Sequence, residues 1–124
     1  MIIGIGTDLV KIDRIAVSIE RWGERFVHKI LAPAEILAYQ KNPSAAFVAK
    51  RFAAKEAVAK ALATGMSCGV HFAQIAVVGK PGYAPQISLT GAAAVRAETL
   101  GVRQMHLSIS DEAEFALAFV VLSG

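Results

Sequence analysis

The chain has 124 residues, 55% of them hydrophobic, and a mean hydropathy of +0.50. This length predicts a single domain over residues 1–124, with enough apolar side chains for its own core. The longest apolar run, residues 115–122, is too short to cross a bilayer, so the surplus apolar surface favours an oligomer over a membrane protein. The net charge of +3 suits an anionic small molecule or an acidic protein and is too weakly basic for a dedicated nucleic-acid binder.

The cysteine content and the N-terminal sequence indicate a cellular compartment. Cys68 is the only cysteine, which excludes an intrachain disulfide, and no signal peptide is visible at the N-terminus. Both features predict a cytoplasmic location. No cluster of His and Cys suggests zinc.

A strand and an amphipathic helix are the first elements expected along the chain. Residues 1–6 form a short apolar run typical of a buried strand. Apolar residues then recur at three- and four-residue steps, which predicts a helix that buries them, interrupted near Gly23. These residues are Ile12, Ile15, Ile19, Trp22 and Phe26.

Basic residues form a second stripe along this helix. Lys11, Arg14, Arg21 and Arg25 recur at near-helical steps, with Ser18 between them. The stripe is either a solvated face or a docking surface for an acidic partner, because clustered charge speeds encounter and fixes orientation.

The rest of the chain predicts three further helices and four strands. A short helix is expected over residues 33–40, and a long one runs from an N-cap at Ser44 to about Thr64, with Gly65 in the left-handed conformation beyond it. Thr90 and Gly101 bound the third helix. The strands are expected at residues 72–78, 86–89, 106–110 and 115–122, the last two joined through residues 111–112 as an antiparallel hairpin. The predicted fold class is α+β, an antiparallel sheet packed against one long helix.

Two short segments contain the candidate chemical groups. Asp8 follows the first strand and is either a helix N-cap or a functional carboxylate, and the glycines before it match a phosphate loop only weakly. Glu56 and Lys60 lie on one face of the long helix and form either a surface ion pair or a site together with Asp8. Because two carboxylates beside a lysine suit Mg²⁺ and substrate phosphates, the pattern gives a hypothesis of metal-assisted phosphoryl transfer.

Three stretches of the sequence match motifs of a known family. They are residues 4–10 followed by Arg14 and Ile15, residues 51–65, and residues 106–112. In this order and spacing they resemble the holo-[acyl-carrier-protein] synthase family of 4′-phosphopantetheinyl transferases, over essentially the whole chain. The resemblance implies an enzyme that transfers the 4′-phosphopantetheine group of coenzyme A to a serine of apo acyl carrier protein. It also implies dependence on Mg²⁺ and release of adenosine 3′,5′-bisphosphate.

The resemblance further implies roles for single residues. Asp8 and Glu56 match the metal ligands of the family, and Lys60 matches a lysine near the coenzyme A phosphates, so these three are the expected catalytic residues. The general base is left open between Glu56 and a metal-bound water. Arg51 matches an arginine associated with the 3′-phosphate of coenzyme A.

Arg51 lies about 140° around the helix from Glu56 and cannot serve the same ion. An arginine that faces elsewhere suits a site between two subunits, and the resemblance implies a homotrimer with its sites there. Thr64 and Gly65 match the loop that lines the cofactor.

Arg14 and Arg21 match the helix that receives the acidic recognition helix of the carrier protein, which favours the docking interpretation of the basic stripe. The chain also departs from the family at two places. Asp111 stands where many members have His, and Tyr83-Ala84-Pro85 stands where some have Gly-Lys-Pro.

Two other function classes are alternatives to the transferase. The first is a non-catalytic carrier-protein or nucleotide-binding module of the same fold, which loss of Asp8, Glu56 or Lys60 would favour. The second is a small nucleic-acid binder, which would need aromatic side chains interleaved with the basic ones, whereas Trp22 and Phe26 fall on the apolar stripe.

Overall fold

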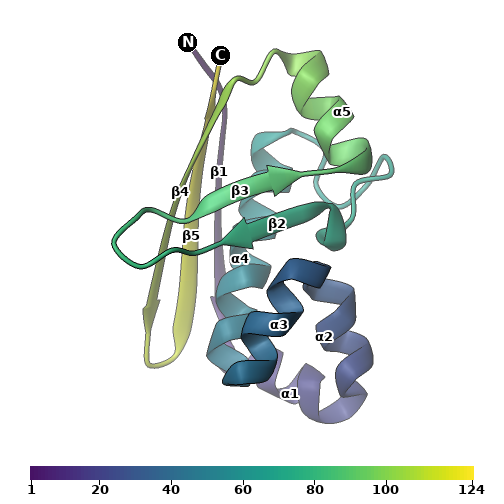
Figure 1. Ribbon diagram of the computed structural model, residues 1–124, viewed down its shortest axis with the longest axis vertical. Helices are drawn as coiled ribbons and strands as arrows, with labels where there is room; N and C mark the ends of the chain where they lie inside the picture. Colours follow the sequence, from purple (N-terminus) through teal and green to yellow (C-terminus); the bar gives the residue numbers. More distant parts are fainter.

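A sheet of three antiparallel strands forms one side of the molecule (Figure 1). In the computed structural model, which describes residues 1–124, β1 spans Ile2–Lys11 and pairs with β5, Phe115–Ser123, which in turn pairs with β4, Gln104–Glu112. The strand order is β1-β5-β4, and the two chain termini lie side by side at one end of the sheet. Because successive side chains of a strand point to opposite faces, the sheet has one buried and one exposed face.

The long helix α4, Ala45–Ala61, covers the buried face of this sheet. The Ser44 hydroxyl oxygen accepts a hydrogen bond from the Phe47 N–H at 3.1 Å, so the predicted N-cap is confirmed. Most of the side chains of α4 that face the sheet are alanines with no exposed area. Small side chains allow the helix to lie close to the strands.

Gly4 and Gly6 of β1 make this close approach possible. A Cβ atom at Gly4 would overlap the carbonyl oxygen of Ala61, and one at Gly6 would overlap that of Ala57. The glycines are therefore needed for strand–helix packing, which accounts for them without a phosphate loop.

Three short helices pack at one end of α4 (Figure 1). They are α1, Ile12–Trp22, α2, Glu24–Ile30, and α3, Pro33–Lys41. Gly23, with φ of 60°, separates α1 from α2, which confirms the predicted interruption. Trp22 was predicted to be buried, and this was wrong, because it ends α1 at this break and its surface is 53% exposed.

A second, two-stranded sheet crosses in front of the first one (Figure 1). It consists of β2, Ile75–Val78, and β3, Gln86–Leu89, and it is followed by α5, Gly91–Leu100. A single turn of 3-10 helix, Phe72–Gln74, replaces the first part of the strand predicted from residue 72. Together with the helices, the two sheets enclose a core of 23 buried residues around α4, and the prediction of an α+β fold is confirmed.

Several predicted boundaries were displaced. The first strand continues to Lys11, because the whole of β1 pairs with β5. The helix predicted to reach Thr64 ends at Ala61, since Ala63 already takes a left-handed φ of 62°. Residues 111–112 belong to β4, and the hairpin turn lies at residues 113–114. None of the helices combines the length and apolarity that a bilayer crossing requires.

Candidate active site between β1 and α4

Asp8 lies inside β1 and faces α4. It is paired with Ala118 of β5, and α1 begins only at Ile12, so the N-cap interpretation of Asp8 was wrong. Asp8 is two residues from Gly6 and therefore on the strand face that packs against the helix. Its side chain remains 15% exposed. A carboxylate is thus presented at the edge of the strand–helix interface.

Lys60 of α4 links the helix to this carboxylate. Its Nζ atom donates to Asp8 Oδ1 at 3.1 Å and to the Thr7 carbonyl oxygen at 3.0 Å. The interpretation of Glu56 and Lys60 as an isolated surface ion pair was wrong, because Lys60 pairs with Asp8 of the neighbouring strand instead. Residues far apart in the chain are therefore brought together in one charged cluster.

Glu56 lies beside this pair, one helical turn before Lys60. Burial raises the pKa of Glu56, the negative charge of Asp8 raises it further, and the positive charge of Lys60 lowers it. Asp8 and Glu56 are thus close enough for their charges to repel each other. We refer to Asp8, Glu56 and Lys60 as the carboxylate cluster.

The carboxylate cluster fits a hard divalent cation. Mg²⁺ uses one or two protein carboxylates and completes its ligand shell with water and phosphate oxygens. Asp8 and Glu56 supply two such carboxylates, and the structure has no group of three or more His, Cys, Asp or Glu side chains arranged as ligands. A bound cation would remove the repulsion between the two carboxylates.

A pH-dependent stability is expected from the raised pKa of Glu56. Protonation of Glu56 favours the folded state. This stabilisation is fully present below the unfolded-state pKa of about 4.3 and is lost as the pH rises through the higher folded-state pKa. Without divalent cations, E56Q is therefore expected to match the unchanged protein in Tm near pH 4 and to exceed it near pH 7. Thermal unfolding followed by circular dichroism at both pH values, in chelator, checks this. An equal or lower Tm for E56Q near pH 7 would contradict the repulsion between the carboxylates.

Arg51 is not part of the carboxylate cluster. Its Nε atom lies 3.4 Å from Glu35 Oε2 of α3, and its guanidinium carbon lies 4.6 Å from the centroid of the Phe47 ring. Burial lowers the pKa of Arg51, and the charge of Glu35 opposes this shift. The structure thus places Arg51 among residues of α3 and the start of α4.

Thr64 and Gly65 form a tight loop immediately beyond α4. Both backbone N–H groups donate to the Ala59 carbonyl oxygen, at 3.2 and 3.1 Å, and the Thr64 hydroxyl donates to the Gly65 carbonyl at 2.9 Å. The Arg96 Nε–H donates to the Leu62 carbonyl at 3.0 Å, which fixes the loop against α5. The loop therefore begins within one turn of Lys60.

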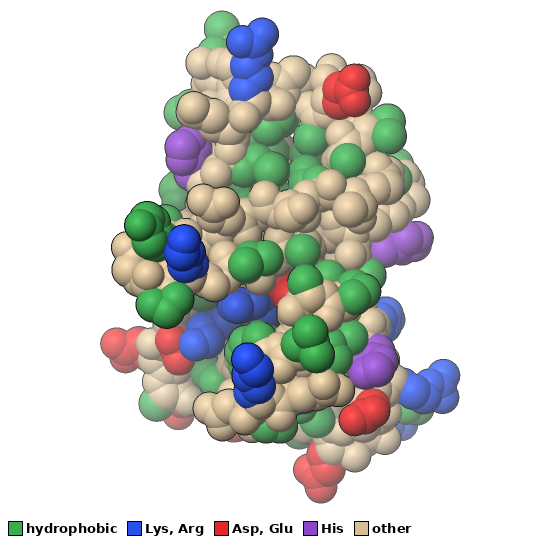
Figure 2. Space-filling model, in the orientation of Figure 1, with side chains coloured by type: hydrophobic (Ala, Val, Ile, Leu, Met, Phe, Trp, Pro, Cys, Tyr) green, Lys and Arg blue, Asp and Glu red, His purple; other side chains and the backbone are tan.

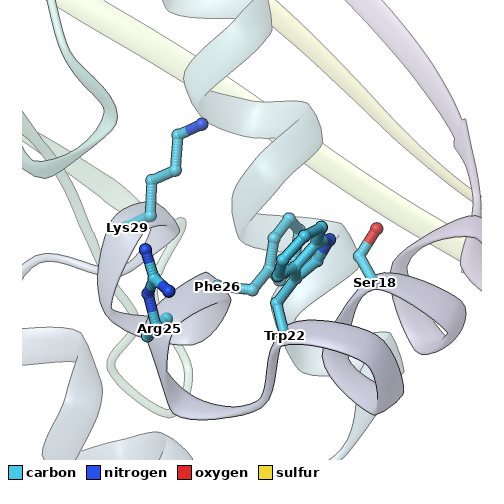
Figure 3. A pocket seen from close by; sticks show the side chains of 5 residues that line it. All are labelled: Ser18, Trp22, Arg25, Phe26 and Lys29. Atoms are coloured by element: carbon cyan, nitrogen blue, oxygen red, sulfur yellow. The ribbon is translucent and has the colours of Figure 1, made fainter.

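Arg14 and Arg21 are exposed on α1, away from the core. Charged side chains gather over the half of the molecule formed by α1, α2 and α3, as Figure 2 shows for one face. A pocket of about 420 Å³ lies at the α1–α2 corner, with Trp22 and Phe26 flanked by Arg25 and Lys29 on one side and by Ser18 on the other (Figure 3). The pocket offers aromatic surface inside a basic rim.

The sequence interpretation did not identify two ion pairs around α4. Glu35 and Lys55 form a buried ion pair, with a distance of 2.5 Å between Nζ and Oε1. Asp111 forms an exposed pair with Lys50 at 3.7 Å. Glu35, a lone acidic residue in an otherwise apolar helical pattern, was the only hint of the buried pair in the sequence. Its partner Lys55 lies twenty residues away, so no local pattern joins the two.

Comparison with known proteins shows the family to which the chain belongs. The model of the 4′-phosphopantetheinyl transferase superfamily matches residues 4–120, and the chain belongs to this superfamily. Its relatives within the superfamily include holo-[acyl-carrier-protein] synthases. The holo-[acyl-carrier-protein] synthase of Halorhodospira halophila is 51% identical over 123 residues, covering 98% of this chain and 98% of that protein.

Solved structures give the same result. The holo-[acyl-carrier-protein] synthase of Neisseria meningitidis superimposes with a TM-score of 0.93 at 38% identity, over 100% of both chains. That of Helicobacter pylori, solved in complex with coenzyme A, gives a TM-score of 0.84 at 34% identity, over 96% of this chain and 99% of that one. The predicted family, and with it the prediction of a phosphopantetheinyl transferase enzyme, is confirmed.

Proposed function

We propose that this enzyme transfers the 4′-phosphopantetheine group of coenzyme A to a serine of apo acyl carrier protein, with Mg²⁺, and releases adenosine 3′,5′-bisphosphate. The serine oxygen forms a bond to the phosphorus that carries the pantetheine arm. The bond from that phosphorus to the oxygen retained by adenosine 3′,5′-bisphosphate breaks, and the serine proton passes to a base. The observation that carries the proposal is the carboxylate cluster, in which Lys60 joins Asp8 of β1 beside Glu56 of α4.

In this proposal Asp8 and Glu56 hold the Mg²⁺ ion. The ion would supply charge stabilisation at the transferring phosphoryl group. Lys60 orients the Asp8 carboxylate and places a positive charge beside the phosphates. The base that takes the serine proton is proposed to be either Glu56 or a water bound to the metal.

Coenzyme A is proposed to extend from this cluster past the loop of Thr64 and Gly65. The loop lies at the end of α4 next to Lys60, and its backbone is fixed by hydrogen bonds to Ala59. Arg51 is proposed to bind the 3′-phosphate from a neighbouring subunit, since in one chain it lies among residues of α3 and not beside the carboxylate cluster.

Cys68, unpaired and exposed, is compatible with the reducing cytoplasm proposed for the reaction.

A homotrimer is proposed from the family resemblance, and the apolar outer face of the sheet supports a subunit interface there. Large side chains there are 39–61% exposed, an unusual surface for an isolated chain. They are Ile5, Leu9, Phe115, Leu117 and Phe119.

Disruption of this face is expected to separate the subunits. F119D places a charge in the apolar face and is expected to sediment as a monomer at concentrations where the unchanged protein is a trimer. V95D, at an exposed apolar position on α5, is the matched control and should remain trimeric. A trimeric F119D in analytical ultracentrifugation would contradict an interface on this face.

The acidic helix of the carrier protein is proposed to dock on α1 and α2. Arg14 and Arg21 supply exposed positive charge, and the pocket beside Trp22 offers apolar surface for a side chain of the partner. The Arg21 guanidinium lies 5.0 Å from the centroid of the Trp22 ring, so the two side chains present one continuous surface.

Removal of Trp22 is expected to weaken this docking selectively. W22A should raise the KM for apo acyl carrier protein about tenfold, the scale of an aromatic contact at the centre of an interface, and leave the KM for coenzyme A unchanged. V95A provides a matched control, because Val95 is exposed but lies on α5. Steady-state kinetics with each substrate varied in turn separates the two effects, and equal changes in both KM values would argue against docking at Trp22.

Release of adenosine 3′,5′-bisphosphate tests the proposed reaction. Chromatography of a mixture of enzyme, coenzyme A, Mg²⁺ and apo acyl carrier protein should yield this product only when all four are present. A non-catalytic module of the same fold would bind coenzyme A or carrier protein and yield no product, so that outcome would favour the alternative.

A further inference from the structure

Glu35 connects three elements of the fold through both of its carboxylate oxygens. Oε1 accepts from the Ala32 N–H at 2.7 Å and from Lys55 Nζ at 2.5 Å, and Oε2 accepts from the Val77 N–H at 3.1 Å. Glu35 is 3% exposed and Lys55 has no exposed surface. The start of α3, the middle of α4 and the strand β2 are therefore fixed to one carboxylate.

The same carboxylate faces Arg51. Oε2 lies 3.4 Å from Arg51 Nε, an atom that is buried and makes no hydrogen bond in the chain. The Phe47 ring covers the guanidinium group, and the Arg51 side chain is 15% exposed. The charge of Glu35 thus faces the Nε edge of the guanidinium group and the Phe47 ring covers one face, which leaves the terminal nitrogens for an anion.

Glu35 also balances two neighbouring cations. Burial lowers the pKa of Lys55, Glu35 opposes this shift by its charge and its hydrogen bond, and Arg51 adds to the lowering. Burial of one positive charge beside another is unfavourable unless an anion lies between them. Without Glu35, Arg51 would be repelled by Lys55 and would lose the negative charge that faces its Nε edge.

We propose that Glu35 is a positioning residue for coenzyme A binding, which fixes the guanidinium group of Arg51 so that its terminal nitrogens face the 3′-phosphate. Lys55 acts through Glu35 by fixing the other carboxylate oxygen. The inference rests on the proposed function, in which Arg51 binds the 3′-phosphate.

The experiment compares coenzyme A with dephospho-coenzyme A, which lacks the 3′-phosphate. The measured quantity is kcat/KM for coenzyme A divided by kcat/KM for dephospho-coenzyme A, with apo acyl carrier protein as the acceptor. E35Q leaves Lys55 buried without an anion and is expected to fold poorly, whereas E35Q/K55M removes both charges and keeps an oxygen for the Ala32 N–H. In E35Q/K55M the ratio should fall about tenfold, the scale of one hydrogen bond to a charged group, with the loss confined to coenzyme A.

Two further variants separate the possible outcomes. R51M should lower the ratio at least as far as E35Q/K55M does, and E98Q, a matched change on the exposed side of α5, should leave it unchanged. If R51M lowers the ratio and E35Q/K55M does not, the positioning role of Glu35 is overturned and the role of Arg51 stands. If R51M leaves the ratio unchanged, the proposed phosphate contact of Arg51 fails, and the inference fails with it. Equal losses with both donors in E35Q/K55M would indicate a purely structural role and overturn the inference.

Discussion

E56Q is expected to lower the rate of phosphopantetheine transfer about a thousandfold or more at saturating Mg²⁺. The change keeps the shape of the side chain and removes the negative charge with which Glu56 would bind the metal and accept a proton. Loss of charge stabilisation at a phosphoryl group has effects of this order. Initial rates with apo acyl carrier protein and coenzyme A measure the loss.

Two observations distinguish this loss from unfolding. E56Q is expected to be at least as stable as the unchanged protein near pH 7, because the repulsion between Glu56 and Asp8 is removed. E98Q, the same chemical change at an exposed site on α5, should keep full activity. A folded E56Q with a nearly unchanged rate would contradict the role proposed for the carboxylate cluster.

G6A is expected to destabilise the protein by about 3 kcal/mol, which corresponds to about 10 °C in Tm. The added Cβ would overlap the Ala57 carbonyl oxygen, and this is a backbone atom of a buried helix that cannot rotate away. The strand and helix must therefore separate, and Asp8 would move away from Lys60. Activity should fall together with stability.

G79A is the matched control for G6A. A Cβ at Gly79 meets no atom within 4 Å, and its backbone is not in the left-handed region. Calorimetry of both variants should show a large decrease in Tm for G6A and almost none for G79A. Similar small changes in both would mean that β1 and α4 do not need the close contact.

Local patterns in the sequence predicted most of the elements. Ser44 and Gly101 mark helix ends because the capping hydrogen bond and the left-handed conformation are decided by single residues. The final hairpin follows from alternating side chains over residues 106–110 and a short connection. Such signals do not depend on the rest of the chain.

The two wrong predictions for single residues have different causes, one tertiary and one local. Asp8 resembles an N-cap when read alone, and only the pairing of β1 with β5 along its full length places it inside a strand. Trp22 has the spacing of a core residue, but Gly23 ends α1 there and leaves about half of its surface exposed. Apolar periodicity assumes a continuous helix, and one glycine was enough to remove that condition.

Only part of the candidate site could be predicted from the sequence. The spacing of Glu56 and Lys60 places them on one face of a helix, but the position of Asp8 opposite them depends on the β1–α4 packing. Glu35 and Lys55 were missed entirely, because a buried ion pair between separate helices leaves no periodic pattern. The roles of Arg51, Thr64 and Gly65 came from family resemblance, and they remain proposals.

The most direct test of the proposed reaction is the intact mass of apo acyl carrier protein after incubation with this enzyme, coenzyme A and Mg²⁺. We predict a mass gain of one phosphopantetheine group, absent when chelator replaces Mg²⁺ and absent with E56A. A carrier protein of unchanged mass in the complete reaction, although the enzyme binds coenzyme A, would contradict transfer and leave a binding module of the same fold. A full mass gain in chelator would contradict the role given to the metal.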